Sequence, residues 1–301
     1  MTIIAIVGPT GSGKSALAMR AAQRTGGEIV SADSRQVYRG MDIGTAKPTA
    51  EERMLVRHHC IDLVDPGTPY DASRYQADGR AALGAIAAAG NPAYVVGGTG
   101  LYVRALLDGL AFDAAPTDPA LRATLEARAA AEGGAALHRE LGSIDAAAAE
   151  RVDPRNARRV VRYLEIAMLA GRVPPKRLER LERRERISCL RIGLDPPRAR
   201  LDERITERVH RMVEAGVLGE TARLVERGVD PSLPSMSAHG YVHWAAHLRG
   251  DVSLDAAIQA TAKDVRAYSR RQMTWFRRDP DIRWVDPLAT DPLSLLEQAA
   301  V

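Results

Sequence analysis

The spacing of apolar and polar residues differs between the first part of the chain and the part that follows Gly109. In its first part, short apolar runs at Ile3–Val7, Glu28–Ser31, Cys60–Val64 and Ala93–Val96 alternate with stretches of helical composition such as Tyr75–Ala89. Strands that alternate with helices in this way are typical of parallel sheets with crossover connections. The pattern therefore predicts a parallel sheet with crossover helices.

The pattern changes after Gly109, where clear strands stop. Residues 116–186 are predicted to form Ala-rich and Arg-rich helices with three breaks, at Gly133-Gly134, Asp153-Pro154 and Val173-Pro174-Pro175. A further strand pattern follows at Cys189–Leu194, and helices continue to about Phe276. We expect an α/β core formed by residues 1–115 and 187–301, interrupted by an all-helical insertion domain at residues 116–186.

Charge is distributed unevenly. The 301 residues carry a formal net charge of +4, but Arg151–Arg191 holds thirteen Arg or Lys against five Asp or Glu. Such a basic cluster is typical of a surface that binds a polyanion. No run approaches the roughly 18 apolar residues of a membrane span, and the distant Cys60 and Cys189 indicate neither a disulfide framework nor a zinc site. We expect a cytoplasmic protein with no membrane partner.

A glycine-rich loop follows the first strand pattern. Gly8–Ser15 reads G-P-T-G-S-G-K-S, which fits the phosphate-binding loop. Its glycines let backbone N–H groups face an anion at the start of a helix, Lys14 adds a cation, and the Ser15 hydroxyl can bind magnesium. The core is therefore expected to be P-loop NTPase-like. A plain glycine turn remains an alternative, and the loop alone fits a kinase, an NTPase or any enzyme that uses a diphosphate.

Two polar residues follow strand patterns at the edge where ligands of parallel sheets bind. Asp33 comes after the second predicted strand and Thr99 after the fourth. Asp33 is a candidate general base toward an amine or hydroxyl, or a magnesium ligand through water, and Thr99 a candidate hydrogen-bond partner. The alternatives are that Asp33 forms a turn or cap and that Thr99 caps the next helix.

Five further segments stand in order along nearly the whole chain: S-A-D-S-R-Q-V-Y-R-G-M-D-I-G-T-A-K-P (Ser31–Pro48), H-H-C-I-D (His58–Asp62), V-G-G-T-G-L-Y (Val96–Tyr102), D-P-R-N-A-R-R-V-V-R (Asp153–Arg162) and R-A-Y-S-R-R-Q-M-T-W-F-R (Arg266–Arg277). Together with the phosphate loop, they resemble the tRNA dimethylallyltransferases, also called tRNA isopentenyltransferases. The Ser31–Pro48 segment is far more specific than the loop alone.

The resemblance implies transfer of a dimethylallyl group from dimethylallyl diphosphate, with Mg²⁺ as cofactor. The acceptor is the N6 amine of the adenosine 3′ of the anticodon, position 37, in tRNAs that read codons starting with U. Asp33 would take the amine proton and Thr99 would help to hold the base. Gly8 and Pro9 belong to the loop, and Ser15 would also bind the metal. The resemblance assigns the diphosphate to Thr10, Gly11, Ser12, Gly13, Lys14, Ser15 and Arg208.

The resemblance also implies contacts with the tRNA anticodon stem-loop. An adenine in a single-stranded loop can leave its stack and enter a pocket. No obligate protein partner is expected, and we expect a monomer. Arg177–Arg186 could also bind RNA phosphates, or it could form an exposed helix whose arginines pair with Glu residues of the same helix. The residues assigned to tRNA are Asp33, Ser34, Arg35, Gln36, Thr99, Arg122, Asn156, Ala157, Arg158, Arg159 and Val160.

Other functions remain open from the sequence. One is prenylation of free adenine nucleotides, which has less need of the basic insertion. Others are a P-loop kinase or NTPase and a nucleotide-binding module without catalysis. His239, His243 and His247 recur at intervals of four, but Gly240 interrupts the first interval and no carboxylate or Cys accompanies them. A metal site there is not favoured.

Overall fold

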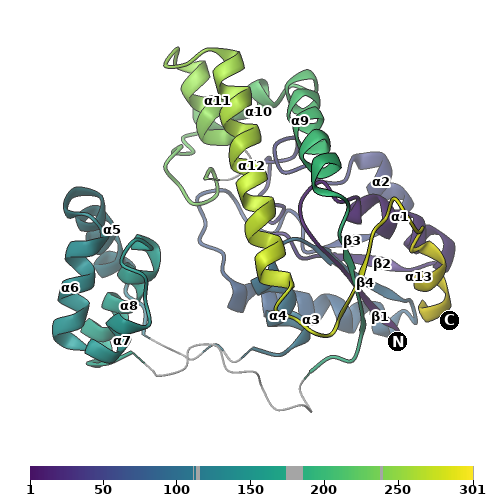
Figure 1. Ribbon diagram of the computed structural model, residues 1–301, viewed down its shortest axis with the longest axis horizontal. Coiled ribbons are helices and arrows are strands. Elements are labelled where there is room, and N and C mark those ends of the chain that lie inside the picture. The colour runs from purple at the N-terminus through teal and green to yellow at the C-terminus, as the bar shows by residue number, and fades with distance from the viewer. Residues whose placement is uncertain (111, 113–115, 174–185, 238–239, 301) are drawn as a thin grey trace. The chain divides into compact units, whose positions relative to one another are not determined.

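The computed structural model describes residues 1–110, 112, 116–173, 186–237 and 240–300, and it divides into two compact units (Figure 1). Unit 1 comprises Met1–Gly109 and Glu182–Val301, and unit 2 comprises Leu110–Leu181. The division expected from the sequence, after residues 115 and 186, differs from this one by a few residues at each junction. Within the described residues, no helix has the length and apolar composition needed to cross a bilayer.

A six-stranded sheet forms the centre of unit 1, and all of its strands are parallel. Its order is β3-β2-β4-β1-β5-β6, so β1 lies between β4 and β5. The predicted α/β class with a parallel core is therefore confirmed. The strands are β1 (Ile3–Val7), β2 (Glu28–Ser31), β3 (His58–His59), β4 (Ala93–Gly97), β5 (Leu190–Leu194) and β6 (Ile282–Val285).

The prediction of a strand at Cys60–Val64 is wrong. The strand is His58–His59, and Cys60 and Asp62 have positive φ angles of 59° and 54° that end it. The chain then pairs with a loop instead of β2, because the N–H groups of Leu63 and Val64 donate to the carbonyl of Val37. The strand β6 was not predicted at all.

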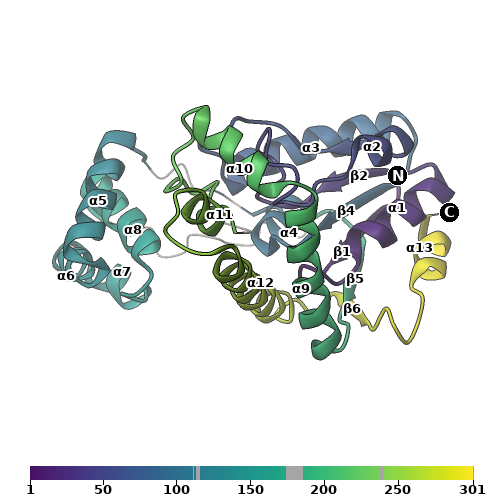
Figure 2. The same ribbon diagram turned by 90° about the horizontal axis from the view of Figure 1, so that it is seen from above.

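Helices cover both faces of the sheet (Figures 1 and 2). On one face, α1 (Lys14–Thr25) and α13 (Leu293–Ala300) pack together over a core that includes Ile4 and Ile6. On the other, α3 (Ala72–Ala88) packs with α4 (Gly100–Leu107). The short α2 (Ala50–Leu55) begins at a capping box in which Thr49 and Glu52 bond each other's backbone N–H groups.

A second group of helices completes unit 1. These are α9 (Arg198–Glu214), α10 (Val217–Glu226), α11 (Tyr241–Leu248) and α12 (Leu254–Phe276). These helices pack on one another (Figure 1). Their core contains the fully buried Trp244. The C-terminal part of α12 reaches the phosphate loop, since Gln272 accepts a hydrogen bond from the N–H of Thr10.

Asp108 anchors unit 1 at the point where the chain leaves it. Its carboxylate is completely buried and accepts hydrogen bonds from Arg191 (2.7 Å), Arg186 (3.2 Å) and Arg104 (3.3 Å). Arg191 also pairs with Asp279 at 2.7 Å. Residues just before and just after the inserted unit are thus joined by one buried network.

Unit 2 is helical and has a core of its own. Leu137, Leu141 and Leu164 are fully buried in it. Asp118 caps the helix at Pro119–Glu132 and Asn156 caps the helix at Ala157–Ala170, both through their side chains. The predicted break at Gly133-Gly134 separates the first of these helices from the next one along the chain. Most of the Arg177–Arg186 run lies outside the described residues. The helices are α5 (Pro119–Glu132), α6 (Gly134–Ile144), α7 (Ala146–Glu150) and α8 (Ala157–Ala170).

Candidate active site

A pocket of about 400 Å³ lies in unit 1 at the carboxyl edge of the sheet. It draws residues from the phosphate loop, from the ends of β2 and β4, from α9 and from α12. The residues with charged or hydrogen-bonding side chains include Lys14, Ser15, Asp33, Arg208, Tyr268 and Gln272. Residues far apart in sequence therefore meet at one small site.

The phosphate loop presents an open helix N-terminus to this pocket. Gly13 precedes α1 with a φ angle of 96°, a left-handed conformation that favours glycine, and no side chain caps the helix there. The first N–H groups of α1, together with the positive end of its dipole, are thus available to an anion. Ser12 is buried beside them, and its hydroxyl has no hydrogen-bond partner among the described residues.

Two basic side chains in the pocket are shielded from water, because Lys14 is buried and Arg208 is half-buried. Burial lowers the pKa of Lys14 from its usual 10.5 to about 7; the nearby Arg208 lowers it as well, whereas Asp33 raises it. Lys14 Nζ donates to the carbonyl of Pro9 at 2.7 Å, and Arg208 Nη1 to Thr10 Oγ1 at 3.1 Å. Burial also lowers the pKa of Arg208. A polyanion placed between them would favour the charged form of both groups.

The pocket contains oxygen donors of the kind that bind magnesium. Among the residues that the structure describes, no group of three His, Cys, Asp or Glu side chains could hold a metal. Ser15 and Asp33 both line the pocket and both carry oxygen donors. Magnesium commonly takes one or two protein oxygens and completes its shell with phosphate and water, so these residues fit it.

Asp33 and Thr99 lie on adjoining loops. Asp33 Oδ1 accepts a hydrogen bond from the N–H of Arg35 at 2.8 Å, so this residue both shapes a turn and lines the pocket. Thr99 occupies the cap position of α4 without bonding that helix through its side chain. Its hydroxyl accepts from the N–H of Ser34 at 3.0 Å and donates to Ser34 Oγ.

Arg35 and Gln36 make structural contacts within unit 1. The guanidinium of Arg35 donates to the carbonyl of Pro234. Gln36 accepts from the hydroxyl of Ser31 at 2.8 Å and donates to the carbonyl of Ala46 at 3.1 Å. Their side chains therefore stabilise the loop that carries Asp33.

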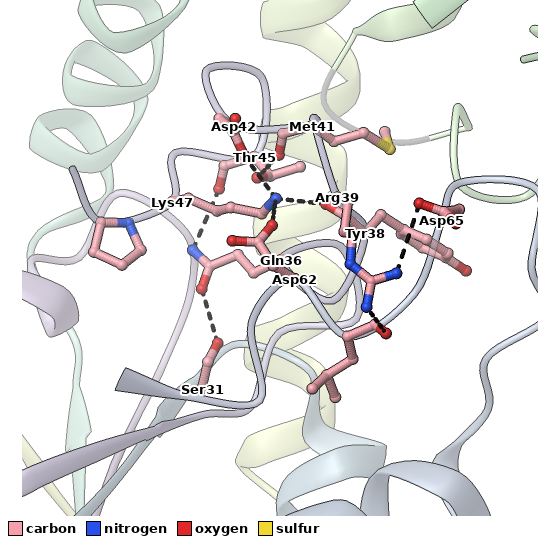
Figure 3. A network of polar contacts seen from close by, with 12 residues as sticks. Ser31, Gln36, Tyr38, Arg39, Met41, Asp42, Thr45, Lys47, Asp62 and Asp65 are labelled. Atoms are coloured by element: carbon pink, nitrogen blue, oxygen red, sulfur yellow. Dashed lines mark hydrogen bonds and ion pairs between the residues drawn. The ribbon is translucent and has the colours of Figure 1, made fainter. Parts of the chain in front are cut away.

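A charged network holds the loop that forms another pocket wall (Figure 3). Lys47 Nζ is almost completely buried and lies 2.7 Å from Asp42 Oδ1 and 2.6 Å from Asp62 Oδ1. Burial alone would raise the pKa of Asp62, but hydrogen bonds from Lys47 and Arg53 hold it below its usual value. Lys47 lies in the Ser31–Pro48 segment that carries the family resemblance, but no role was predicted for it.

Glu220, on α10, fixes the same loop from the other side. Its buried carboxylate accepts hydrogen bonds from the N–H groups of Asp42 (2.8 Å), Ile43 (2.7 Å) and Gly44 (3.1 Å). Tyr241 on α11 donates to it at 2.6 Å. Helices distant in sequence thus determine where this wall of the pocket stands.

Unit 2 carries the other residues assigned to tRNA. Asn156 caps α8, Arg158 and Arg159 are exposed, and Val160 is buried in the core. Arg159 lies over the ring of Tyr163, 5.4 Å from its centre. Side-chain contact with RNA is thus open to the two arginines but not to Val160.

The histidine series has ordinary partners where it is described. His243 lies 2.9 Å from a carboxylate oxygen of Asp264, and the ring of His247 bonds the carbonyl of Val252. His239 lies outside the described residues. No group of three metal-binding side chains forms among the residues described.

The fold and this pocket define an α/β protein of the phosphate-loop type with a helical insertion. The model of the family described as IPP transferase matches residues 36–279, and that described as isopentenyl transferase matches residues 1–62. The chain belongs to the IPP transferase family, whose members transfer prenyl groups.

Similar proteins support this assignment over nearly the whole chain. The tRNA dimethylallyltransferase of Anaeromyxobacter dehalogenans (strain 2CP-1 / ATCC BAA-258) is 49% identical over 95% of this chain and 93% of its own. That of Thermomicrobium roseum is 49% identical over 94% and 86%. The crystal structure of a tRNA isopentenylpyrophosphate transferase from Bacillus halodurans has a TM-score of 0.71 at 38% identity, covering 99% and 93%. A eukaryotic dimethylallyltransferase acting on tRNA has a TM-score of 0.73 at 26% identity, covering 100% and 77%.

Proposed function

We propose that this protein transfers the dimethylallyl group of dimethylallyl diphosphate to the N6 amine of the adenosine 3′ of the anticodon in tRNAs that read codons starting with U. The observation that carries this proposal is one pocket that joins Asp33 to the phosphate loop, Lys14 and Arg208. Relatives that match nearly the full chain are named tRNA dimethylallyltransferases. We also propose that the protein acts in the cytoplasm.

The phosphate loop and its cations act on the leaving group. When the bond between the prenyl carbon and the diphosphate oxygen breaks, negative charge develops on that oxygen. The N–H groups at the start of α1, Lys14 and Arg208 are already in place to stabilise it in a poorly solvated pocket. A magnesium ion held by Ser15 and the diphosphate would supply further charge neutralisation.

Asp33 and Thr99 act on the nucleophile. As the nitrogen of the adenine amine bonds to the prenyl carbon it must lose a proton, and the carboxylate of Asp33 takes it. Thr99 holds the loop of Asp33 through Ser34, and its hydroxyl is a hydrogen-bond partner for the base. The C–O bond to the diphosphate breaks, the C–N bond forms and the amine proton passes to Asp33, so the products are diphosphate and the prenylated adenosine.

Unit 2 provides the phosphate-binding surface for the anticodon stem-loop. Arg158 and Arg159 lie exposed at the start of α8, in the most basic part of the chain. Such contacts position RNA without reading its sequence and weaken as salt increases. We propose a monomer without an obligate protein partner.

The test follows label from radiolabelled dimethylallyl diphosphate, with magnesium, into an anticodon stem-loop, with AMP and ATP offered in parallel. Asp33→Asn keeps the oxygen that accepts from Arg35 but removes the base, so transfer should fall by at least about 100-fold with RNA binding retained. Asp251→Asn, at an exposed site, serves as the control. Label in free nucleotide alone, or ATP hydrolysis without transfer, would contradict the proposal.

A further inference from the structure

Gln272 occupies the space between two loops of the active site. It lies on α12, its side chain is 5% exposed, and both ends of its amide are bonded. Oε1 accepts from the N–H of Thr10 at 2.8 Å, and Nε2 donates to the carbonyl of Gly98 at 2.9 Å. The orientation of the amide is therefore fixed, since the reversed amide would set donor against donor and acceptor against acceptor.

The backbone of Gly98 lies very close to the side-chain amide of Gln272. A Cβ atom on Gly98 would lie 2.1 Å from Nε2 of Gln272. The amide therefore lies in tight contact with the Gly98 loop, where even a methyl group would not fit. Movement of either loop away from the other would break one of the two buried hydrogen bonds, which is costly when the group cannot turn to water instead.

The two loops carry opposite halves of the proposed reaction. Thr10 belongs to the phosphate loop and accepts a hydrogen bond from Arg208, which lines the same pocket. Gly98 directly precedes Thr99, whose N–H donates to the carbonyl of Ala32, next to Asp33. Gln272 thus connects the leaving-group side of the pocket to the side that accepts the amine proton.

Tyr268 extends this connection. It lies four residues earlier on the same helix, lines the pocket, and hydrogen-bonds with Thr99 and Gln272. Burial raises the pKa of Tyr268, so its hydroxyl stays protonated and able to donate. Tyr268 therefore supports the Thr99 side of the connection, whereas Gln272 bonds both loops.

We propose that Gln272 is a positioning residue that sets the distance between the diphosphate cradle and the Asp33/Thr99 side of the pocket. The inference rests on the proposed function. Bond formation requires the reacting atoms to be about 3–3.5 Å apart, and a misplacement of about 1 Å costs roughly 100-fold in rate. In the proposed function the diphosphate binds at the phosphate loop and the adenine binds beside Asp33 and Thr99, so Gln272 should affect the reaction step more than the binding of either substrate.

Gln272→Met tests this, because methionine keeps the volume and removes both hydrogen bonds. We expect kcat to fall by roughly 100-fold, with KM for dimethylallyl diphosphate and for the stem-loop changed by less than about threefold. Gln259→Met, an exposed glutamine on the same helix, controls for the substitution. A large rise in either KM with kcat unchanged would place Gln272 in the binding surface and overturn the proposal.

Gln272→Glu adds a pH signature that a purely structural role would not give. A protonated carboxyl can accept from Thr10 and donate to Gly98 as the amide does, whereas the carboxylate cannot donate. The kcat of this variant relative to wild type should therefore rise as the pH is lowered from about 8 to about 6. A flat ratio would overturn the proposal.

Amide hydrogen exchange at Thr10 separates the inference from the proposed function. Exchange should accelerate in Gln272→Met and remain slow in Gln259→Met, whatever group the enzyme transfers. Unchanged exchange would show that Gln272 does not hold the loop, whereas wild-type enzyme that transfers nothing to RNA would overturn only the proposed function.

Discussion

Arg122 donates hydrogen bonds to both carboxylate oxygens of Glu165, a side chain that is completely buried in unit 2. Burial alone would raise the pKa of Glu165, but Arg162 and Arg122 hold it below its usual value. The guanidinium of Arg122 is therefore fixed by the fold before any RNA arrives. A substitution of Arg122 that weakened RNA binding could therefore act in two ways, by removing a contact with the RNA and by destabilising unit 2.

Arg122→Ala should lower the free energy of unfolding by about 1–3 kcal/mol, because it removes a partner from a buried carboxylate. Arg162 and the N–H of Asp118 remain bonded to Glu165 and limit the loss. Chemical denaturation measures the change. Arg139→Ala, exposed on α6, should be nearly neutral, and equal stability of the two variants would refute the structural role of Arg122.

Arg158→Ala combined with Arg159→Ala should weaken stem-loop binding and reduce its dependence on salt. Each phosphate contact contributes about 0.7–0.9 to the slope of log affinity against log salt, so the double variant should lose up to about 1.8. Titrations at several salt concentrations measure the slope. An unchanged slope would show that the arginines at the start of α8 do not contact RNA phosphates.

Lys14 makes stability depend on pH. Its pKa is about 7 in the folded protein and 10.5 when exposed, so the unfolded chain binds more protons between these values. Stability therefore rises with pH across that window, by up to about 1.4 kcal/mol per pH unit from this group. The unfolding free energy of wild type minus that of Lys14→Met should therefore increase from about pH 7 to about pH 10. Parallel curves would contradict the lowered pKa.

Glu220→Gln should destabilise the protein by about 2 kcal/mol, because an amide NH₂ would face backbone N–H groups that now donate to a carboxylate. Tyr241→Phe removes one hydrogen bond to the same carboxylate and should cost about 1 kcal/mol. Thermal unfolding ranks the two variants. The reverse order would show that Glu220 is not the main support of residues 42–44.

The sequence predicted those parts of the fold that local patterns determine. The β1 strand, the phosphate loop and the start of α1 follow one another along the chain, so a short motif specifies all three. The end of β3 could not be predicted in this way, because Lys47 and Arg53 bind Asp62 from outside the strand.

Long-range partners explain the missed site residues. Gln272 bonds a residue 262 positions away, and Glu220 bonds residues about 177 positions away, so no local pattern marks either of them. Arg208 was identified through the family resemblance, although its helix alone suggests a solvated arginine. Val160 was assigned to RNA by the same resemblance, but only its burial shows that its side chain faces the core.

The bond between Asp108 and Arg186 has a consequence for how such proteins diversify. The inserted unit comprises Leu110–Leu181, and this bond joins a residue just before it to a residue shortly after it. A segment whose ends are tied in this way replaces a single surface loop, so its length and composition can change without moving a strand. The position is a natural graft site, at which one helical module can be exchanged for another while the catalytic chemistry is inherited unchanged.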